Sequence, residues 1–189
     1  MSDQSSSYVR LLGLSGSLRR ASNSTAILRA LQAELGADAD LELGDIRLPL
    51  YNEDEDGANS GAVVTAFRRA ISEADGLMIS TPEYNHGVPG VLKNALDWAS
   101  RPSGKSSLRN KPVLIISNSP GFTGGVRAQA QLNETLLSVE AVILPGRQIV
   151  IGGVADKIKD GKFVDKTNLG FALDAMHRLI DLCRPPVVL

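Results

Sequence analysis

The strongest constraint on the fold is a regular alternation between short apolar runs and longer segments with helical spacing. Strand-like runs cover residues 9–15, 41–46, 76–80, 112–119 and 141–144, and residues 149–151 extend the last of them. Segments with a helical pattern cover residues 22–35, 61–74, 88–100, 126–141 and 166–183. Strands that alternate with helices predict βαβ units, and therefore a parallel sheet with helices on both faces.

Five strands and five helices predict an α/β protein with a three-layer, doubly wound, flavodoxin-like fold. The expected sheet has five parallel strands in the order 2-1-3-4-5. The chain of 189 residues suits one domain, which we place at residues 8–189, after a polar tail at residues 1–7 that we expect to be disordered. In such a sheet a ligand binds beyond the carboxyl ends of the first and third strands, where the strand order reverses.

Composition narrows the classes of partner. Charged residues make up 22% of the chain and the net charge is −1, which predicts neither a nucleic-acid-binding nor a membrane-binding surface. The single cysteine, Cys183, excludes an internal disulfide and agrees with a reducing compartment. The first residues lack a secretory pattern and no apolar stretch is long enough to span a bilayer. We therefore expect a cytoplasmic protein without membrane insertion.

The loop after the first strand is rich in hydroxyl and basic side chains. It is SGSLRRASNS, residues 15–24, and it leads directly into a helix. The free N–H groups and the dipole of a helix N-terminus attract anions. The glycines and the lysine of the two common nucleotide-binding loops are absent. A loop with hydroxyls in their place predicts a site for a terminal phosphate, although Ser22 and Asn23 are also ordinary helix caps.

Two further loops are expected at the same edge of the sheet. The first, TPEYNHG at residues 81–87, presents Tyr84 for stacking, the alternative being a packed tyrosine in an ordered turn. The second, SNSPGFTGG at residues 117–125, contains glycines that allow its backbone to approach a ligand closely. A phosphate pocket beside a platform for a flat ring predicts a site for flavin mononucleotide, FMN.

These motifs resemble one family. The segments GSLRRASNS and TPEYNHGVPGVLKNALDW, together with LPLYNED and GGVRAQ, are similar to the NADPH-dependent FMN reductases, which include bacterial quinone, chromate and azo reductases. The family's phosphate loop has the pattern GSxRxxSxN, which Gly16, Ser17, Arg19 and Ser22 match. The final Asn position holds Ser24, and Asn23 lies one place earlier, so the resemblance leaves open which of the two contacts the phosphate.

The resemblance implies a set of binding residues. Those expected at the phosphate and the ribityl chain are Ser15, Ser17, Arg19, Ser22 and either Asn23 or Ser24. Those expected along the isoalloxazine ring are Pro82, Glu83, Tyr84, Asn85 and the amide of Gly87, with Ser117 and Gly121 on its far side.

The function that the resemblance implies is an FMN-dependent NAD(P)H oxidoreductase. It passes a hydride from the nicotinamide to bound FMN, and the electrons then go to a small acceptor, which is a quinone, a flavin, an azo compound or a metal oxyanion. Because the flavin carries the chemistry, we assign no catalytic side chain and no metal. The choice between NADH and NADPH stays open, with Arg19, Arg20 and Arg127 as candidates for a 2′-phosphate contact.

Two other functions are compatible with the same loops. A flavodoxin-type electron carrier binds FMN without a nicotinamide site, although such carriers are usually strongly acidic. A sugar-phosphate-binding protein can share the fold, because fold alone does not determine function.

The apolar residues of segment 88–100 spread over more than one narrow face. We therefore expect part of this helix to be buried against a second copy of the chain, in a homodimer or a homotetramer.

Overall fold

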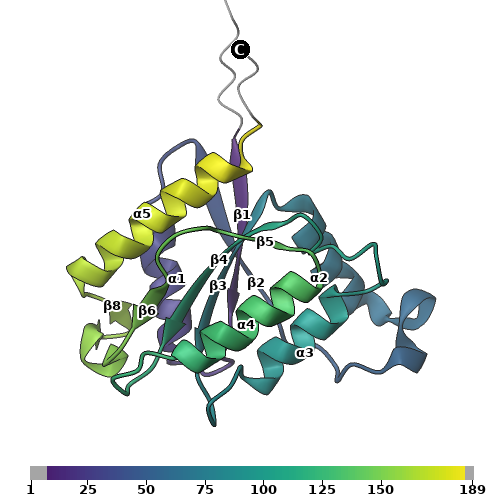
Figure 1. Ribbon diagram of the computed structural model, residues 1–189, viewed down its shortest axis with the longest axis horizontal. Helices are drawn as coiled ribbons and strands as arrows, with labels where there is room; N and C mark the ends of the chain where they lie inside the picture. Colours follow the sequence, from purple (N-terminus) through teal and green to yellow (C-terminus); the bar gives the residue numbers. More distant parts are fainter. Residues whose placement is uncertain (1–7, 186–189) are drawn as a thin grey trace, which may run out of the picture.

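The computed structural model describes residues 8–185, in which helices cover both faces of one parallel sheet (Figure 1). The main strands pair in the order β2-β1-β3-β4-β5, as predicted. Their bounds are Val9–Ser15 for β1, Ala39–Gly44 for β2, Gly76–Pro82 for β3, Pro112–Asn118 for β4 and Val142–Ile143 for β5. The expected tail at residues 1–7 and the last four residues of the expected domain lie outside the described residues.

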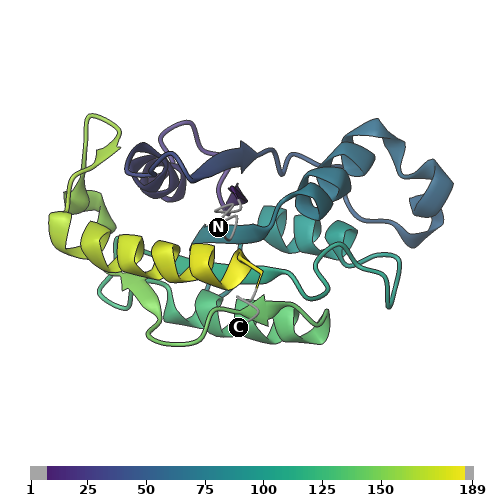
Figure 2. The same cartoon turned by 90° about the horizontal axis from the view of Figure 1, so that it is seen from above.

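Helices α1 and α5 pack on one face of the sheet, and α2, α3 and α4 pack on the other (Figures 1 and 2). Successive residues of a strand point to opposite faces, so Leu11 of β1 joins the first core and Leu12 joins the second. The helices span Asn23–Ala33 for α1, Gly61–Glu73 for α2, Gly90–Ala99 for α3, Val126–Ser138 for α4 and Lys166–Cys183 for α5.

Several short elements were not predicted as separate elements: residues 149–151 were expected to extend the last strand, and the others were not expected at all. Strand β6, Ile149–Ile151, pairs with the end of β4, while β7, Ile158–Lys159, and β8, Lys162–Phe163, form a separate antiparallel hairpin. Asp160 and Gly161 make the turn of this hairpin, both with positive φ, which is the dipeptide that favours a tight hairpin turn. Three 3-10 helices complete the structure: Glu53–Glu55, Gly57–Asn59 and Val154–Lys157.

Much of the broad apolar surface of α3 is covered within the chain. Trp98 is fully buried. Its Nε1–H donates to the Pro49 carbonyl at 2.8 Å, and the Tyr51 ring packs edge-on with the ring centroids 4.9 Å apart. On another side, the Arg68 guanidinium lies 5.5 Å from the Trp98 ring centroid. The width of the apolar stripe therefore reflects contacts with the segment before α2 and with α2 itself.

The register of the sheet aligns the carboxyl ends of its three central strands. Ser15, the last residue of β1, is paired with Ser80 of β3, and Pro82, the last residue of β3, is paired with Asn118 of β4. The Gly16 N–H continues the ladder by donating to the Ser80 carbonyl at 2.7 Å. The loops that follow these strands therefore leave the sheet at one edge.

Candidate functional site

Three loops meet at the carboxyl edge of the sheet, and hydrogen bonds tie them together. The Oγ of Ser17 lies 3.4 Å from the Tyr84 hydroxyl, which links the loop after β1 to the loop after β3. The Asn118 amide, at the end of β4, donates to Ser24 Oγ at 2.8 Å and to the Thr81 carbonyl at 3.1 Å. The predicted meeting of these loops is therefore present in the structure.

The start of α1 combines capped and uncapped N–H groups. Ser22 is the N-cap of this helix. Its Oγ accepts the Thr25 N–H at 3.2 Å, and its carbonyl accepts the Ala26 N–H at 3.0 Å. Ser15 Oγ lies 3.3 Å from Ser22 Oγ and accepts the Thr25 hydroxyl at 2.8 Å. The cap leaves the N–H groups of Asn23 and Ser24 available, as the first turn of a helix does. Ser22 is thus a helix cap that borders a set of free donors.

The loop between β1 and α1 is held tightly against β3. Ser17, which is 9% exposed, accepts the Arg19 N–H on its Oγ at 3.3 Å. The exposed Arg19 guanidinium folds back to donate to the Ala21 carbonyl at 2.6 Å. A Cβ at Gly16 would lie only 2.6 Å from Thr81 Oγ1. Glycine is therefore needed at this position for the loop to approach the end of β3.

Asn23 and Ser24 differ in where their side chains lie. Ser24 is 1% exposed, and its hydroxyl accepts the Asn118 amide. Asn23 is half-buried and lines the groove beside α1. The Ser24 side chain is thus part of the core, and only Asn23 presents its side chain at the surface of the loop.

The loop after β3 contains a tight two-residue turn. Tyr84 and Gly87 exchange two backbone hydrogen bonds of 3.0 Å, with Asn85 and His86 between them. Both central residues have positive φ, 48° for Asn85 and 65° for His86, as a type I′ turn requires. A Cβ at Gly87 would lie 2.8 Å from Gln131 Oε1 on α4. This close packing and the paired backbone fix the turn beside α4.

Glu83 caps α4 with its carboxylate. The side chain is 9% exposed, and its Oε2 accepts the N–H groups of Arg127 at 3.0 Å and Ala128 at 3.3 Å. Burial opposes ionisation of this carboxyl. The two N–H donors and the Arg127 guanidinium, which lies 3.3 Å from Oε1, outweigh burial and lower the pKa of Glu83. The carboxylate and the Arg127 side chain are therefore engaged with each other and with the start of α4.

The loop after β4 has a buried beginning and an exposed tip. Ser117 is fully buried, and its hydroxyl donates to Gln129 Oε1 at 3.0 Å. Gly121 is exposed, and its N–H donates to Ser119 Oγ at 3.1 Å. Phe122 follows with its side chain fully exposed. An exposed phenylalanine in this loop offers an apolar surface beside the shared edge.

The structure divides the predicted site residues into two groups. Nine lie in the converging loops with an exposed or loop-facing group: Ser15, Ser17, Arg19, Ser22, Asn23, Tyr84, Asn85, Gly87 and Gly121. Four have their side chains packed into the protein: Ser24, Pro82, Glu83 and Ser117. The second group can offer a ligand its backbone, while its side chains hold the loops in place.

Sequence reasoning missed two residues at this edge, Asn118 and Phe122. Asn118 is 1% exposed, and its Oδ1 has no hydrogen-bond partner among residues 8–185. A polar residue ending an otherwise apolar strand was the available signal for Asn118. An aromatic residue between glycine and threonine was the signal for Phe122.

The other reactive side chains take no part in this arrangement. His86 and His177 are both exposed. Burial, with the negative charge of Asp75 nearby, raises the pKa of the Cys183 thiol to about 11, so the thiol is protonated at neutral pH. Asp56, from the acidic run before α2, pairs with Arg68 at 2.7 Å. Within the described part of the chain, no cluster of three or more His, Cys, Asp or Glu residues is placed to hold a metal ion.

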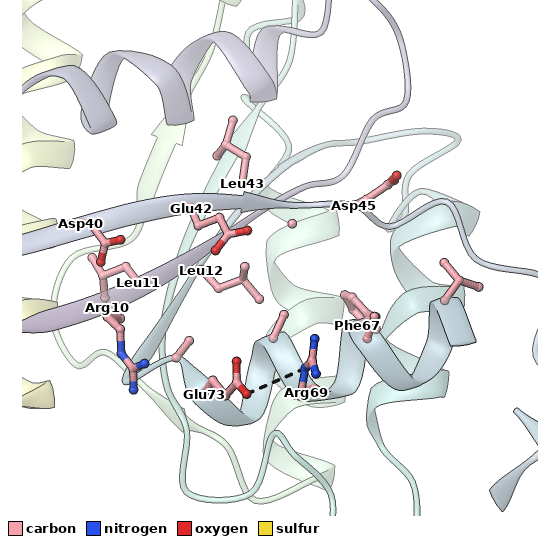
Figure 3. A pocket seen from close by; sticks show the side chains of 15 residues that line it. Arg10, Leu11, Leu12, Asp40, Glu42, Leu43, Asp45, Phe67, Arg69 and Glu73 are labelled. Carbon is pink, nitrogen blue, oxygen red and sulfur yellow. Dashed lines mark ion pairs between the residues drawn. The ribbon is translucent and has the colours of Figure 1, made fainter. Parts of the chain in front are cut away.

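A second groove, of about 550 Å³, lies between β2 and α2, away from these loops (Figure 3). Its charges are mixed: Arg10 and Arg69 face four acidic side chains, which are Asp40, Glu42, Asp45 and Glu73. Arg69 lies 3.8 Å from Glu73 on the same helix. None of the residues from the three converging loops lines this groove, so it is separate from the candidate site.

Comparison with known proteins identifies the family. The family model of the NADPH-dependent FMN reductases matches residues 9–156, a range that contains all three converging loops. The chain belongs to this family. FMN is therefore its flavin and NAD(P)H its reductant, as the resemblance implied.

Individual relatives of this FMN reductase agree with the family assignment. An NAD(P)H-dependent FMN reductase of Pseudomonas aeruginosa is 37% identical over 174 residues, covering 92% of this chain and 85% of the relative. A 2-hydroxy-1,4-benzoquinone reductase of a Burkholderia species is 45% identical over 130 residues, which is 68% of this chain and 70% of the relative. These matches favour an enzyme over an electron carrier or a sugar-phosphate-binding protein.

A solved structure confirms the predicted fold. The flavoenzyme NAD(P)H:(acceptor) oxidoreductase FerB of Paracoccus denitrificans superposes with a TM-score of 0.83 at 32% sequence identity. The match covers 93% of this chain and 97% of FerB. Among the described residues of the FMN reductase, no helix has the length and apolarity to cross a membrane.

Proposed function

We propose that residues 8–189 form one FMN-binding domain that uses NAD(P)H to reduce a quinone or another small acceptor, such as a free flavin, an azo compound or a metal oxyanion. The observation that carries the proposal is the contact between Ser17 and Tyr84, which joins a hydroxyl-rich helix start to a rigid turn. When bound, FMN accepts a hydride from the nicotinamide and passes two electrons to the acceptor. A quinone would thereby become a hydroquinone: it gains the two electrons and one hydrogen that the hydride supplies, and one proton from water.

We propose that the start of α1 holds the phosphate. The N–H groups of Asn23 and Ser24 point out of the first turn, where the positive end of the helix dipole favours an anion. Ser15 and Ser17 add hydroxyl groups that can rotate to donate. The exposed Arg19 guanidinium adds a positive charge. This donor set fits a phosphate monoester, which has three oxygens to satisfy.

The two other loops are proposed to hold the ring. Tyr84 and Asn85, with the backbone from Pro82 to Gly87, form one wall, and the backbone of the loop after β4 at Gly121 forms the other. A turn fixed by paired hydrogen bonds can present backbone N–H groups without rearrangement. Such preorganised donors stabilise negative charge that develops on a ligand during reaction. The same rigidity keeps the nicotinamide and the ring at reacting distance.

The oligomer is part of the proposal, and an exposed leucine beside α3 supports it. Leu50 is 84% exposed. Its two neighbours are fixed to α3: the Pro49 carbonyl accepts the Asn94 amide at 2.9 Å, and the Tyr51 N–H donates to Asn94 Oδ1 at 2.8 Å. Leu50 is thus a rigidly held apolar side chain beside α3, and its burial against a second copy of the chain would be favourable. We propose a homodimer or a homotetramer with α3 and Leu50 in the contact.

The cytoplasm is the proposed site of action. The reductant NAD(P)H is made and consumed there. The chain's single cysteine is a free thiol, which agrees with a reducing compartment.

Absorption spectroscopy tests the proposed function. We expect the purified protein mixed with FMN to show a bound-flavin spectrum, and anaerobic NADPH or NADH to bleach it. Addition of 1,4-benzoquinone should then restore the oxidised spectrum with one quinone consumed per flavin. A bound flavin that neither nucleotide bleaches would contradict the reductase function and favour an electron carrier. Failure to bind FMN would contradict the assignment of the three loops.

A further inference from the structure

A wide groove lies beside the phosphate loop. It has a volume of about 940 Å³ and runs between the outer face of α1 and the β7–β8 hairpin, which lie side by side in Figure 2. The end of the groove at the phosphate loop is lined by Arg19, Ser22 and Asn23. Pro120, from the loop after β4, also lines the groove. The groove therefore opens directly onto two of the three loops proposed to hold FMN.

The floor of this groove is apolar. Ala26 and Ala30 of α1 lie on one side, and Ile158 and Phe163 of the hairpin lie on the other. Phe163 is 6% exposed and belongs to the hydrophobic core. Small alanine side chains on α1 leave room for a flat group between the helix and the hairpin. The floor is thus suited to a planar, mostly apolar part of a ligand.

The rim of the groove is basic. Four cationic side chains line it, Arg19, Arg20, Arg29 and Lys162, against two acidic ones, Glu34 and Asp160. All four cations are exposed, and none forms a salt bridge within residues 8–185. The groove between β2 and α2 differs, because there acidic side chains outnumber the arginines. The excess of positive charge favours a ligand that carries several negative charges.

We propose that this groove binds the adenosine 2′-phosphate end of NADPH, which makes the enzyme selective for NADPH over NADH. The inference rests on the proposed function, because it assigns the second half of the same co-substrate. Adenine supplies the flat group for the apolar floor, and the 2′-phosphate supplies negative charge for the rim. Arg29 and Lys162 are the specificity residues, one from α1 and one from the hairpin.

The position of the groove supports this occupant. The nicotinamide has to lie against the flavin ring, between the loops after β3 and β4, so the rest of the dinucleotide must leave that site along the surface. Pro120 and Asn23 border both the loops and the groove. A dinucleotide can therefore place its nicotinamide at the ring and its adenosine between α1 and the hairpin. NADH offers the same adenine but lacks the dianionic 2′-phosphate.

Binding of nucleotide fragments tests the groove without turnover. Adenosine 2′,5′-bisphosphate and adenosine 5′-monophosphate differ only in the 2′-phosphate, and calorimetric titration measures the affinity of the FMN-loaded protein for each. We expect the bisphosphate to bind about tenfold more tightly or better. Arg29→Glu and Lys162→Glu should each remove this preference. Arg69→Glu makes the same change of charge on α2, outside the groove, and should leave the preference intact.

Steady-state kinetics provides the second readout. Arg29→Glu and Lys162→Glu should raise the KM for NADPH about tenfold relative to the KM for NADH, whereas Arg69→Glu should leave this ratio unchanged. Equal affinity for the two adenosine nucleotides would overturn the inference. A KM for NADPH that stays within twofold of the wild type in both variants would also overturn it. If neither nicotinamide nucleotide bleaches the flavin, the proposed function fails, while the fragment titration still decides what the groove binds.

Discussion

Ser17 is the residue at which the phosphate loop and the turn after β3 meet. It is 9% exposed, and its Oγ both accepts the Arg19 N–H and contacts the Tyr84 hydroxyl. Ser17→Asp should place a carboxylate beside the phosphate of FMN. At an effective dielectric constant of about 20, two like charges some 4 Å apart repel by about 4 kcal/mol, and part of this is screened by solvent. We expect FMN to bind at least about 100-fold more weakly.

Fluorescence quenching of FMN measures this affinity, and Ser17→Asn is the matched control. Asparagine has the shape of aspartate without its charge, so it separates repulsion from loss of the hydroxyl. Equal affinities for the Asp and Asn variants would mean that the phosphate lies away from Ser17.

At the scale of single residues, the sequence predicted which loops come together, but it did not predict which side chains point into the protein. Ser24 and Asn23 are adjacent polar residues, and the sequence does not distinguish them. In the structure the hydroxyl of Ser24 accepts the Asn118 amide inside the protein. Asn118 is 94 residues away along the chain, so this preference is set by tertiary contact. The capping role of Glu83 was not predictable for the same reason, because the N–H groups that it accepts lie 44 and 45 residues away along the chain.

Among the elements, α4 depends on a cap from another loop. Its own N-cap residue, Gly125, makes no side-chain hydrogen bond, and the Glu83 carboxylate accepts two N–H groups of the first turn in its place. Glu83→Gln keeps the size of the side chain and removes the charge. At pH 7 we expect a loss of about 1 kcal/mol in the free energy of unfolding, as for other helix caps.

The lowered pKa of Glu83 gives this loss a defined pH dependence. Because the folded protein favours the carboxylate, the stabilisation is fully present above the ordinary glutamate value of 4.5 and disappears as the pH falls through the lowered folded pKa. Urea unfolding of both proteins between pH 7 and pH 3.5 measures the difference. A difference that stays constant over this range would show that charge at Glu83 does not stabilise α4.

The elements themselves were largely predictable, because hydrophobic periodicity reports which residues are buried. All five helices and the five main strands appear where the sequence places them, with ends that differ by a few residues. The β7–β8 hairpin was missed, although its Asp160–Gly161 turn is a recognised signal, because each of its strands has only two residues. A run that short has no measurable alternation.

At the scale of the whole molecule, the sheet order followed from the sequence, while the covering of α3 did not. A doubly wound sheet leaves few choices of strand order once helices and strands alternate. Trp98 is covered by Pro49 and Tyr51 from an irregular segment, and irregular segments have no periodic pattern to reveal their position. The apolar width of α3 therefore indicated burial correctly, and contacts within the chain account for part of that burial.

The proposed oligomer gives a prediction at this same scale. Leu50→Glu should convert the wild-type dimer or tetramer to a monomer at micromolar concentration, because a charge would be buried without a partner in the contact. Sedimentation velocity measures the mass, and circular dichroism checks that the fold is kept. Leu182→Glu makes the same change on α5, in the opposite helix layer, where the leucine is 42% exposed, and should leave the oligomer intact. A wild-type protein that sediments as a monomer would refute the interface, and FMN would then have to be held by one chain alone.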